Sequence, residues 1–165
     1  NEIDFLRNNH FRNDVISKIS RNSKNNVLIL VDYIDHGEAI FNQLKNDLKN
    51  KEVFYIKGDV EIADRERIRK IMEYKENIIC VAISKIFSTG INIKNLHYII
   101  FGGGGKSKIK VLQSIGRGLR LHSSKNTLYI IDIADQLYYG IQHQKKRQEF
   151  YDQEKISHQT IKLYE

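Results

Sequence analysis

The sequence predicts an α/β fold in three layers, with a mostly parallel central sheet of five or more strands and helices on both faces. Two observations support this. Short, continuous apolar runs rich in β-branched residues recur along the chain, and segments with a helical spacing of apolar residues separate them. Strands that are apolar on both faces are typical of a parallel sheet covered on both sides. A length of 165 residues and an apolar content of 41% suit one globular domain.

The five expected strands are the apolar runs themselves. "VLILV" is continuous and β-branched, as a strand buried on both faces would be, and the later runs repeat this character. They lie at 27–31, 53–56, 78–83, 96–101 and 128–133. We find no internal repeat and no inner domain boundary, so the strands are expected to share one sheet.

The expected helices fill the intervals between these runs. Apolar residues at helical spacing predict one helix from Ile3 to about Arg21. A second helix is expected after Asp35, which is placed to cap it. Further helices are expected at 61–74 and 111–120. After Ala134 the chain becomes rich in Gln, Lys and Arg, which predicts one or two helices, with "QTIKLYE" at 159–165 as a candidate edge strand.

The charge and the cysteine content limit the possible partners and sites. A net charge of +7 favours a polyanionic partner such as nucleic acid. Cys80 is the only cysteine and lies inside the apolar run "IICVAI", so a buried strand position is expected, with no disulfide and no metal site built from several cysteines within the chain. We expect no metal-binding residues. No apolar stretch approaches the ~18 residues of a membrane span, and the first residues lack a signal-peptide core. We expect an intracellular protein with no membrane partner.

The glycine run at 102–105 precedes Lys106 and Ser107, which together resemble the end of a phosphate-binding loop. A loop of the Walker type also needs a glycine at position 100, where the chain has Ile100. We therefore favour a sharp turn at the end of a strand, followed by lysines at 106, 108 and 110 on the exposed side of the sheet's carboxyl edge. A variant phosphate-loop enzyme using Lys106 and Ser107 stays open as an alternative.

The segment "QSIGRGLR" carries the strongest chemical signal. Arg117 and Arg120 are three residues apart, so on a helix they present two guanidinium groups to one target. The segment resembles motif VI of superfamily 2 helicases, Gln-x-x-Gly-Arg-x-x-Arg, which lies in the second of their two RecA-like domains. The resemblance implies that Arg117 and Arg120 are catalytic and reach the γ-phosphate of ATP, with Gln113 and Gly116 in the ATP site.

The segment "FSTGINIKNLHYIIF" at 87–101 is similar to motif V of the same family. The resemblance implies that Gly90 and Asn92 contact ATP and that Thr89 contacts nucleic acid. Many relatives have Asp in place of Asn92, which leaves the ribose contact open. Just upstream, Ser84 and Lys85 are candidates for phosphate contacts. A helix or turn cap is an equally good interpretation of Ser84.

Two further segments resemble the family in order and spacing. "NNVLILVDYIDHGEAIFNQL" at 25–44 is similar to motif IV, and "IKGDVEIADRERI" at 56–68 to the region that follows it. Among relatives this second region lies near the DNA path. The positions assigned to nucleic-acid binding outside motif V are Lys57, Gly58, Arg65, Lys106 and Lys108. Within the superfamily, the stretch from 87 to 120 is most similar to the UvsW-type phage helicases, which remodel branched DNA.

The resemblance implies the second motor domain of an ATP-dependent DNA helicase. Neither a Walker loop nor an acidic Mg²⁺-binding motif occurs in the sequence, so ATP and Mg²⁺ are expected to be held mainly by a first RecA-like domain, and this chain alone is expected to be inactive. Residues 1–24 would be a linker-proximal helix, 25–133 the motor core, and 134–165 a helical extension.

The expected partners are that first domain and DNA, either branched or single- or double-stranded, with RNA left open. A phage-encoded protein acting in the cytoplasm of a bacterial host fits the resemblance. A stand-alone nucleic-acid-binding module with the same fold is the remaining alternative.

Overall fold

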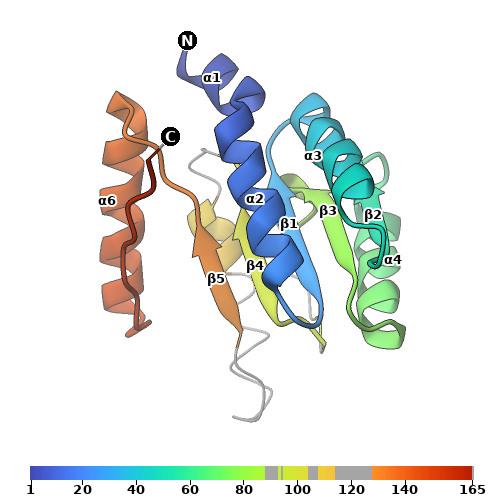
Figure 1. Ribbon diagram of the computed structural model, residues 1–165. Helices are drawn as coiled ribbons and strands as arrows, with labels where there is room; N and C mark the ends of the chain where they lie inside the picture. The colour runs from blue at the N-terminus through green and yellow to red at the C-terminus, as the bar shows by residue number, and fades with distance from the viewer. Residues whose placement is uncertain (88–92, 94, 104–107, 114–127, 165) are drawn as a thin grey trace.

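The computed structural model describes the chain except for residues 88–92, 94, 104–107, 114–127 and 165. Its centre is one five-stranded parallel sheet in the order β2-β3-β1-β4-β5 (Figure 1). The strands are β1 (Val27–Val31), β2 (Val53–Ile56), β3 (Ile79–Ile83), β4 (Tyr98–Phe101) and β5 (Tyr129–Asp132). This arrangement confirms the α/β fold class predicted from the sequence.

The register of the sheet is set by its two fully buried strands. All five residues of β1 and all five of β3 are buried, and Leu28 of β1 pairs with Cys80 of β3 and with Ile99 of β4. These residues form one core with Ile40 and Ile68 from the flanking helices. A strand surrounded by protein on both faces and both edges is most stable when every side chain is apolar, which explains the continuous apolar runs.

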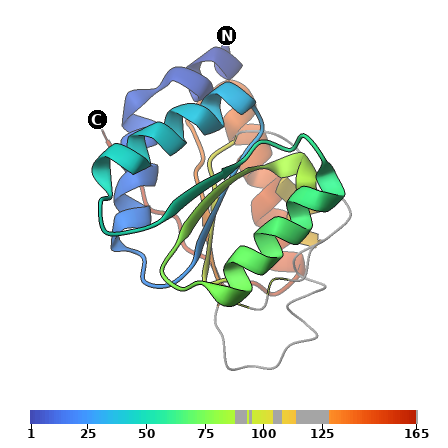
Figure 2. The ribbon, with the colours of Figure 1, turned by 90° about the vertical axis from the view of Figure 1, so that its right-hand side faces the viewer.

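Helices cover both faces of the sheet (Figure 2). The helices α1, α2 and α3 lie on one face and α4 on the other, while α6 lies beside β5 (Figure 1). A short 3₁₀ helix, η1, follows β3, and residues 108–113 are also helical. The bounds are α1 (Glu2–Asn8), α2 (His10–Asn22), α3 (Ile34–Asp47), α4 (Glu61–Tyr74), α6 (Tyr138–Gln153) and η1 (Ser84–Phe87).

The first expected helix is in fact two. Asn9 has an extended backbone, with φ −75° and ψ 110°, and separates α1 from α2. Its side-chain oxygen accepts a hydrogen bond of 2.7 Å from the backbone N–H of Arg12, so it caps α2. The prediction of one continuous helix was wrong because the apolar spacing does not show that an Asn side chain competes with the helical backbone.

The start of α3 also differs from the prediction. The helix begins at Ile34 after Tyr33, which makes no side-chain cap. Asp35 therefore lies in the first turn, where it pairs with Arg7 of α1 and accepts a 2.9 Å hydrogen bond from the N–H of His36. A carboxylate in the first turn is stabilised by the helix dipole without capping the helix.

The candidate edge strand near the C-terminus is absent from the described residues 159–164, which have no regular secondary structure. Side-chain contacts hold the residue before this segment and one residue within it along α6 instead. His158 pairs with Asp152 at 2.9 Å, and Gln148 donates to Thr160 at 3.4 Å. The tail therefore follows α6 and does not reach a strand edge. The helix expected at 111–120 begins earlier, at 108, and its part after 113 lies outside the described residues.

Candidate functional site

All five strands end at the same edge of the sheet, because the sheet is wholly parallel. The residues that follow the strand ends are therefore brought together there, although they are far apart in the sequence. Ligands of open parallel sheets bind at this carboxyl edge. The segments in question are Asp32–Tyr33 after β1, Lys57–Gly58 after β2, Ser84–Lys85 after β3, Gly102–Gly103 after β4 and Ile133–Asp135 after β5.

Lys57, Gly58 and Lys85 lie together at the ends of two neighbouring strands. Ile56 of β2 pairs with Ala82 of β3, which aligns the two turns. Gly58 has a φ of +83°, and a Cβ at this position would lie 3.2 Å from Cε of Lys85. Both lysines are exposed. The left-handed glycine turn thus lets the Lys85 side chain pass close to the backbone, and two ammonium groups face solvent at this edge.

Arg65 lies on α4, the helix that follows the Lys57–Gly58 turn, and is only partly exposed. Its Nη1 atom is 3.8 Å from Oε1 of Glu61 and has no hydrogen-bond partner among the described residues, although it is shielded from solvent. Arg69, one turn further on, is held by Glu66 and Glu73, at 2.5 and 2.7 Å. An unsatisfied guanidinium N–H is stabilised by any anionic acceptor that reaches it, which distinguishes Arg65 from Arg69.

The hydroxyl group of Ser84 is already engaged. Its Oγ donates a 3.1 Å hydrogen bond to the carbonyl oxygen of Val31, and the residue is buried. Ser84 therefore fastens the start of η1 to the end of β1. A capping side chain would accept a hydrogen bond from a nearby backbone N–H, whereas this hydroxyl donates to a carbonyl of β1, so the bond does not support the capping interpretation. A phosphate contact by Ser84 stays a prediction.

The structure contradicts the expectation that Lys108 lies on the exposed side of the edge. Lys108 is 3% exposed, and its Nζ donates to Oδ1 of Asp132 at 3.1 Å and to the carbonyl oxygen of Ile133 at 3.2 Å. Burial lowers the pKa of Lys108 to about 8, opposed by the charge of Asp132. The side chain turns inward because an acid at the end of β5 provides a partner there. Lys110 is exposed, as expected.

Gln113 is an exposed residue at the end of the described helical segment 108–113, whose Val111 and Leu112 are buried in the core. The segment is thus packed on one side and presents Gln113 on the other. The remaining predicted site residues lie outside the described residues: Gly90, Asn92, Thr89, Lys106, Gly116, Arg117 and Arg120. Their assignments stay predictions.

The sequence did not reveal a buried group of charges behind this edge. Asp132 of β5 accepts hydrogen bonds from Lys108, from Nε of Arg147 at 2.5 Å and from the hydroxyl of Tyr151 at 2.8 Å. Only the position of Asp132 directly after the apolar run "YII" gave a signal, because an acid there must find a partner. Nothing in the sequence indicated that the partners would come from α6.

Beside this group, Arg12 of α2 binds residues that follow β4 and β5 at the carboxyl edge of the sheet. Its Nε lies 3.0 Å from both carboxylate oxygens of Asp135, and its guanidinium also donates to the carbonyl oxygen of Gly102. Arg12 is 3% exposed. The ends of β4 and β5 are therefore tied to α2 by a charge-assisted network.

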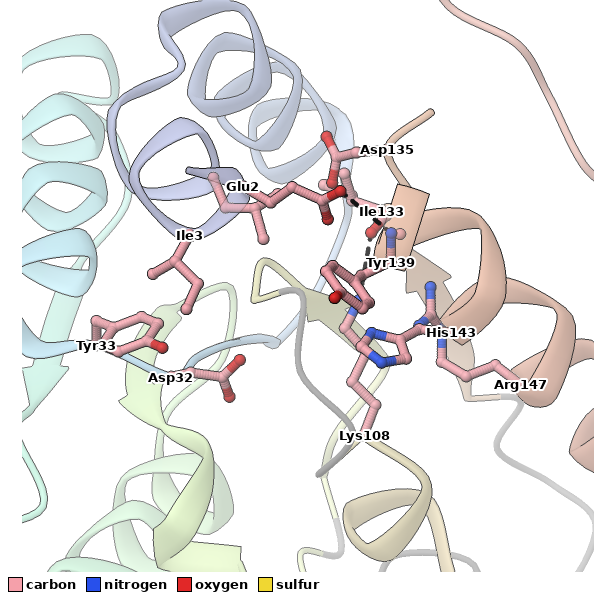
Figure 3. A pocket seen from close by; sticks show the side chains of 12 residues that line it. Glu2, Ile3, Asp32, Tyr33, Lys108, Ile133, Asp135, Tyr139, His143 and Arg147 are labelled. Atoms are coloured by element: carbon pink, nitrogen blue, oxygen red, sulfur yellow. Dashed lines mark hydrogen bonds between the residues drawn. The ribbon is translucent and has the colours of Figure 1, made fainter. Parts of the chain in front are cut away.

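A cavity of about 230 Å³ opens at the same edge, between α1, α6 and the ends of β1 and β5 (Figure 3). Figure 3 shows Asp32 and Tyr33 on one side of it and Tyr139, His143 and Lys108 on the other. Glu2 accepts a 3.1 Å hydrogen bond from the backbone N–H of Tyr139, which joins α1 to the start of α6.

In the part of the chain that the structure describes, no group of three or more His, Cys, Asp and Glu side chains is arranged to hold a metal ion. None of the described helices is long and apolar enough to cross a membrane.

Comparison with known proteins identifies the fold and the family. Residues 10–122 match the family described as the helicase conserved C-terminal domain. The chain is 39% identical over 127 residues to the ATP-dependent DNA helicase uvsW of Enterobacteria phage T4, which covers 75% of this chain and 25% of that protein. The chain thus spans about a quarter of the length of this relative.

Solved structures agree with this match. The crystal structure of T4 UvsW superimposes with a TM-score of 0.71 at 32% identity, covering 93% of this chain and 34% of that chain. The C-terminal domain of the DEAD-box protein Dbp5 superimposes with a TM-score of 0.64 over 89% of this chain and 82% of that one. At 15% identity the second match shows the RecA-like fold alone.

Proposed function

This chain belongs to the helicase conserved C-terminal domain family and is of the UvsW type, and from that premise we propose that it is the second motor domain of an ATP-dependent helicase that remodels branched DNA. The substrate, the ATP and the Mg²⁺ are then shared with a first RecA-like domain of the same protein. In this proposal the chain supplies arginine fingers and part of the nucleic-acid track.

One observation carries the proposal. The Lys57–Gly58 turn and Lys85 follow strand ends at the carboxyl edge of the sheet, and the helical segment 108–113 begins at the same edge, where Lys108 bonds to Asp132 and Ile133 at the end of β5. That segment runs directly into Arg117 and Arg120 along the chain. A basic surface and an arginine motif on one edge suit a domain that must respond to ATP and to nucleic acid together.

In the proposed mechanism, the two domains close on ATP. Arg117 and Arg120 then stabilise the charge that develops on the transferred phosphoryl group, which accelerates hydrolysis ~10³–10⁵-fold for fingers of this kind. Gly90 and Asn92 contact the nucleotide, and Thr89 transmits closure to the DNA. Repeated closing and opening moves the domains along a strand by turns.

The nucleic-acid contacts of this domain go mainly to phosphates. Lys57 and Lys85 at the carboxyl edge and Arg65 on α4 carry positive charge, and the left-handed turn at Gly58 lets the Lys85 side chain pass close to the backbone. Contacts of this type make binding dependent on salt and indifferent to sequence. Lys106 is a further candidate for a phosphate contact. Lys108 is excluded from this role because its ammonium group is buried and paired with Asp132.

The decisive experiment replaces Arg120 in the full-length protein. Arg120→Ala is expected to abolish DNA-stimulated ATP hydrolysis while DNA binding changes little, because the finger acts on the transition state and not on the track. Arg21→Ala is the matched control, since Arg21 is an exposed arginine at the end of α2. Turnover that is unchanged by Arg120→Ala would contradict the proposed role of this domain.

A further inference from the structure

The carboxylate of Asp132 connects three separate elements. It lies at the end of β5 and binds Lys108 from the helical segment 108–113 through Oδ1. Through Oδ2 it binds Arg147 and Tyr151, which both belong to α6. The helical segment and α6 do not follow one another in the chain, so this one carboxylate fixes their relative position.

The connection is buried, which makes it rigid. Lys108 and Arg147 are each 3% exposed, and Tyr151 is 7% exposed. Burial by itself raises the pKa of Asp132. The charges of Lys108 and Arg147 and the hydrogen bonds from Arg147 and Tyr151 lower this pKa by more than burial raises it, so the carboxylate is ionised. A buried acid that accepts hydrogen bonds from two cations holds their geometry more tightly than an exposed pair does.

Lys108 is held on two sides. Its ammonium group also donates to the carbonyl oxygen of Ile133, the first residue after β5. Val111 and Leu112 of the same helical segment are buried in the core. The ion pair therefore fixes where the segment begins, the apolar side chains fix its rotation, and Gln113 is presented on the exposed side as a consequence.

We propose that Asp132 is a positioning residue for the ATP site, acting through Lys108 on the helical segment that presents Gln113 and anchored from behind by Arg147 and Tyr151 of α6. The inference rests on the proposed function and adds to it. It makes α6 a structural part of the motor, because two of its buried side chains set the position of a segment that the proposed function assigns to the ATP site.

The test uses ATP hydrolysis by the full-length protein. Asp132→Asn keeps the shape of the side chain but removes its charge, and Lys108→Met keeps the length of the lysine without its ammonium group. Both variants are expected to lower kcat about tenfold, the size of effect that a small misplacement at an active site produces, with the KM for ATP and the affinity for DNA changing about twofold or less. Lys108→Arg, which keeps a charge for Asp132, is expected to restore most of kcat.

The matched control is Lys51→Met. Lys51 is a partly buried lysine whose Nζ, like that of Lys108, donates to backbone carbonyl oxygens, but these belong to Ser20 and Ser23 at the opposite edge of the sheet. This variant is expected to lower the unfolding temperature and to leave kcat unchanged. If Asp132→Asn or Lys108→Met proves too unstable to purify, Tyr151→Phe removes a single hydrogen bond to Asp132 and is expected to lower kcat about threefold.

A double-mutant cycle with Gln113→Ala separates positioning from general destabilisation. If Asp132 acts through this segment, the loss of kcat in the double variant is much smaller than the product of the two single losses. Multiplicative losses, or an unchanged kcat in Asp132→Asn, would overturn the inference. Failure of the proposed function can be told apart from failure of this inference. It would appear as normal ATP turnover in Arg120→Ala, whatever the kcat of the Asp132 variants.

Discussion

The ring of Tyr55 lies against the backbone of Gly37. A Cβ at position 37 would be 2.7 Å from Oη of Tyr55 and 2.8 Å from its ring carbon Cε2. The ring is not free to move away, because its hydroxyl donates a 2.5 Å hydrogen bond to the carbonyl oxygen of Ile34, and the ring stacks on Phe41 with centroids 5.7 Å apart. The contact sets the distance between α3 and β2.

Gly37→Ala is therefore expected to destabilise the chain, although alanine at a helix position usually stabilises by up to ~1 kcal/mol. The added methyl group forces Tyr55 out of its place, and we expect a loss of about 1–3 kcal/mol in the free energy of unfolding, the usual range for overpacking. Urea denaturation followed by circular dichroism measures it.

The same contact predicts that the effect of Gly37→Ala on the free energy of unfolding changes when Tyr55 is also replaced. In Tyr55→Ala the obstacle is gone, so adding Gly37→Ala should be neutral or stabilising. A Gly37→Ala substitution that costs the same in both backgrounds would show that another contact restricts position 37.

His36 is expected to make the chain sensitive to acid. Its ring lies buried in the first turn of α3, with Nε2 3.2 Å from Oδ1 of Asn13. Burial, and after it the charge of Arg12, lower the pKa of His36 to about 4. Between pH 6.5 and 4 the unfolded chain binds a proton that the folded chain does not, so stability falls as the pH falls through this window, by up to about 3 kcal/mol.

The matched variant is His36→Gln, which does not titrate and keeps a donor for Asn13. Thermal melting at pH 7 and at pH 4.5 should show a smaller loss of stability in the variant than in the natural sequence. Equal losses would mean that other groups cause the sensitivity to acid.

Cys80 is expected to be unreactive in the folded state. It lies in the middle of the sheet with no exposed surface, and burial raises the pKa of its thiol to about 12. Because the thiolate is the reactive form, a disulfide reagent such as 5,5′-dithiobis(2-nitrobenzoate) should modify it only when the chain unfolds. Labelling followed against urea concentration should coincide with the unfolding curve, and fast labelling in buffer alone would contradict the burial.

The basic edge predicts a change in the salt dependence of nucleic-acid binding. Replacing Lys57 and Lys85 together with alanine in the full-length protein should weaken DNA binding uniformly across sequences and reduce the slope of log K against log salt by about 1–2. The control replaces Lys24 and Lys49, which are exposed residues preceding β1 and β2 at the opposite edge. Equal changes in both double variants would place the DNA elsewhere.

The local sequence predicted much of the fold. The expected strands 27–31 and 53–56 and the expected helix 61–74 have the same bounds in the structure. These elements are set by the spacing of apolar residues within a few turns, and a buried parallel sheet requires just such runs. The motif residues also indicated the protein family without reference to tertiary contacts, because they follow one another along the chain.

The contacts between distant segments were decided only by the tertiary structure. The sequence predicted that Lys108 is exposed, but in the structure it is buried and bonded to Asp132 at the end of β5. The side chain of Asn26 is fully buried and donates to the carbonyl oxygens of Met72 and Lys75 at the end of α4 and of Asn95 before β4, which joins segments that no local pattern connects. Sequence alone determined the strands of the sheet and most of the helices, since burial periodicity is local, but it missed the break at Asn9. Which polar groups face inward depended on partners brought near by the fold, because a buried charge is stable only beside its counter-charge.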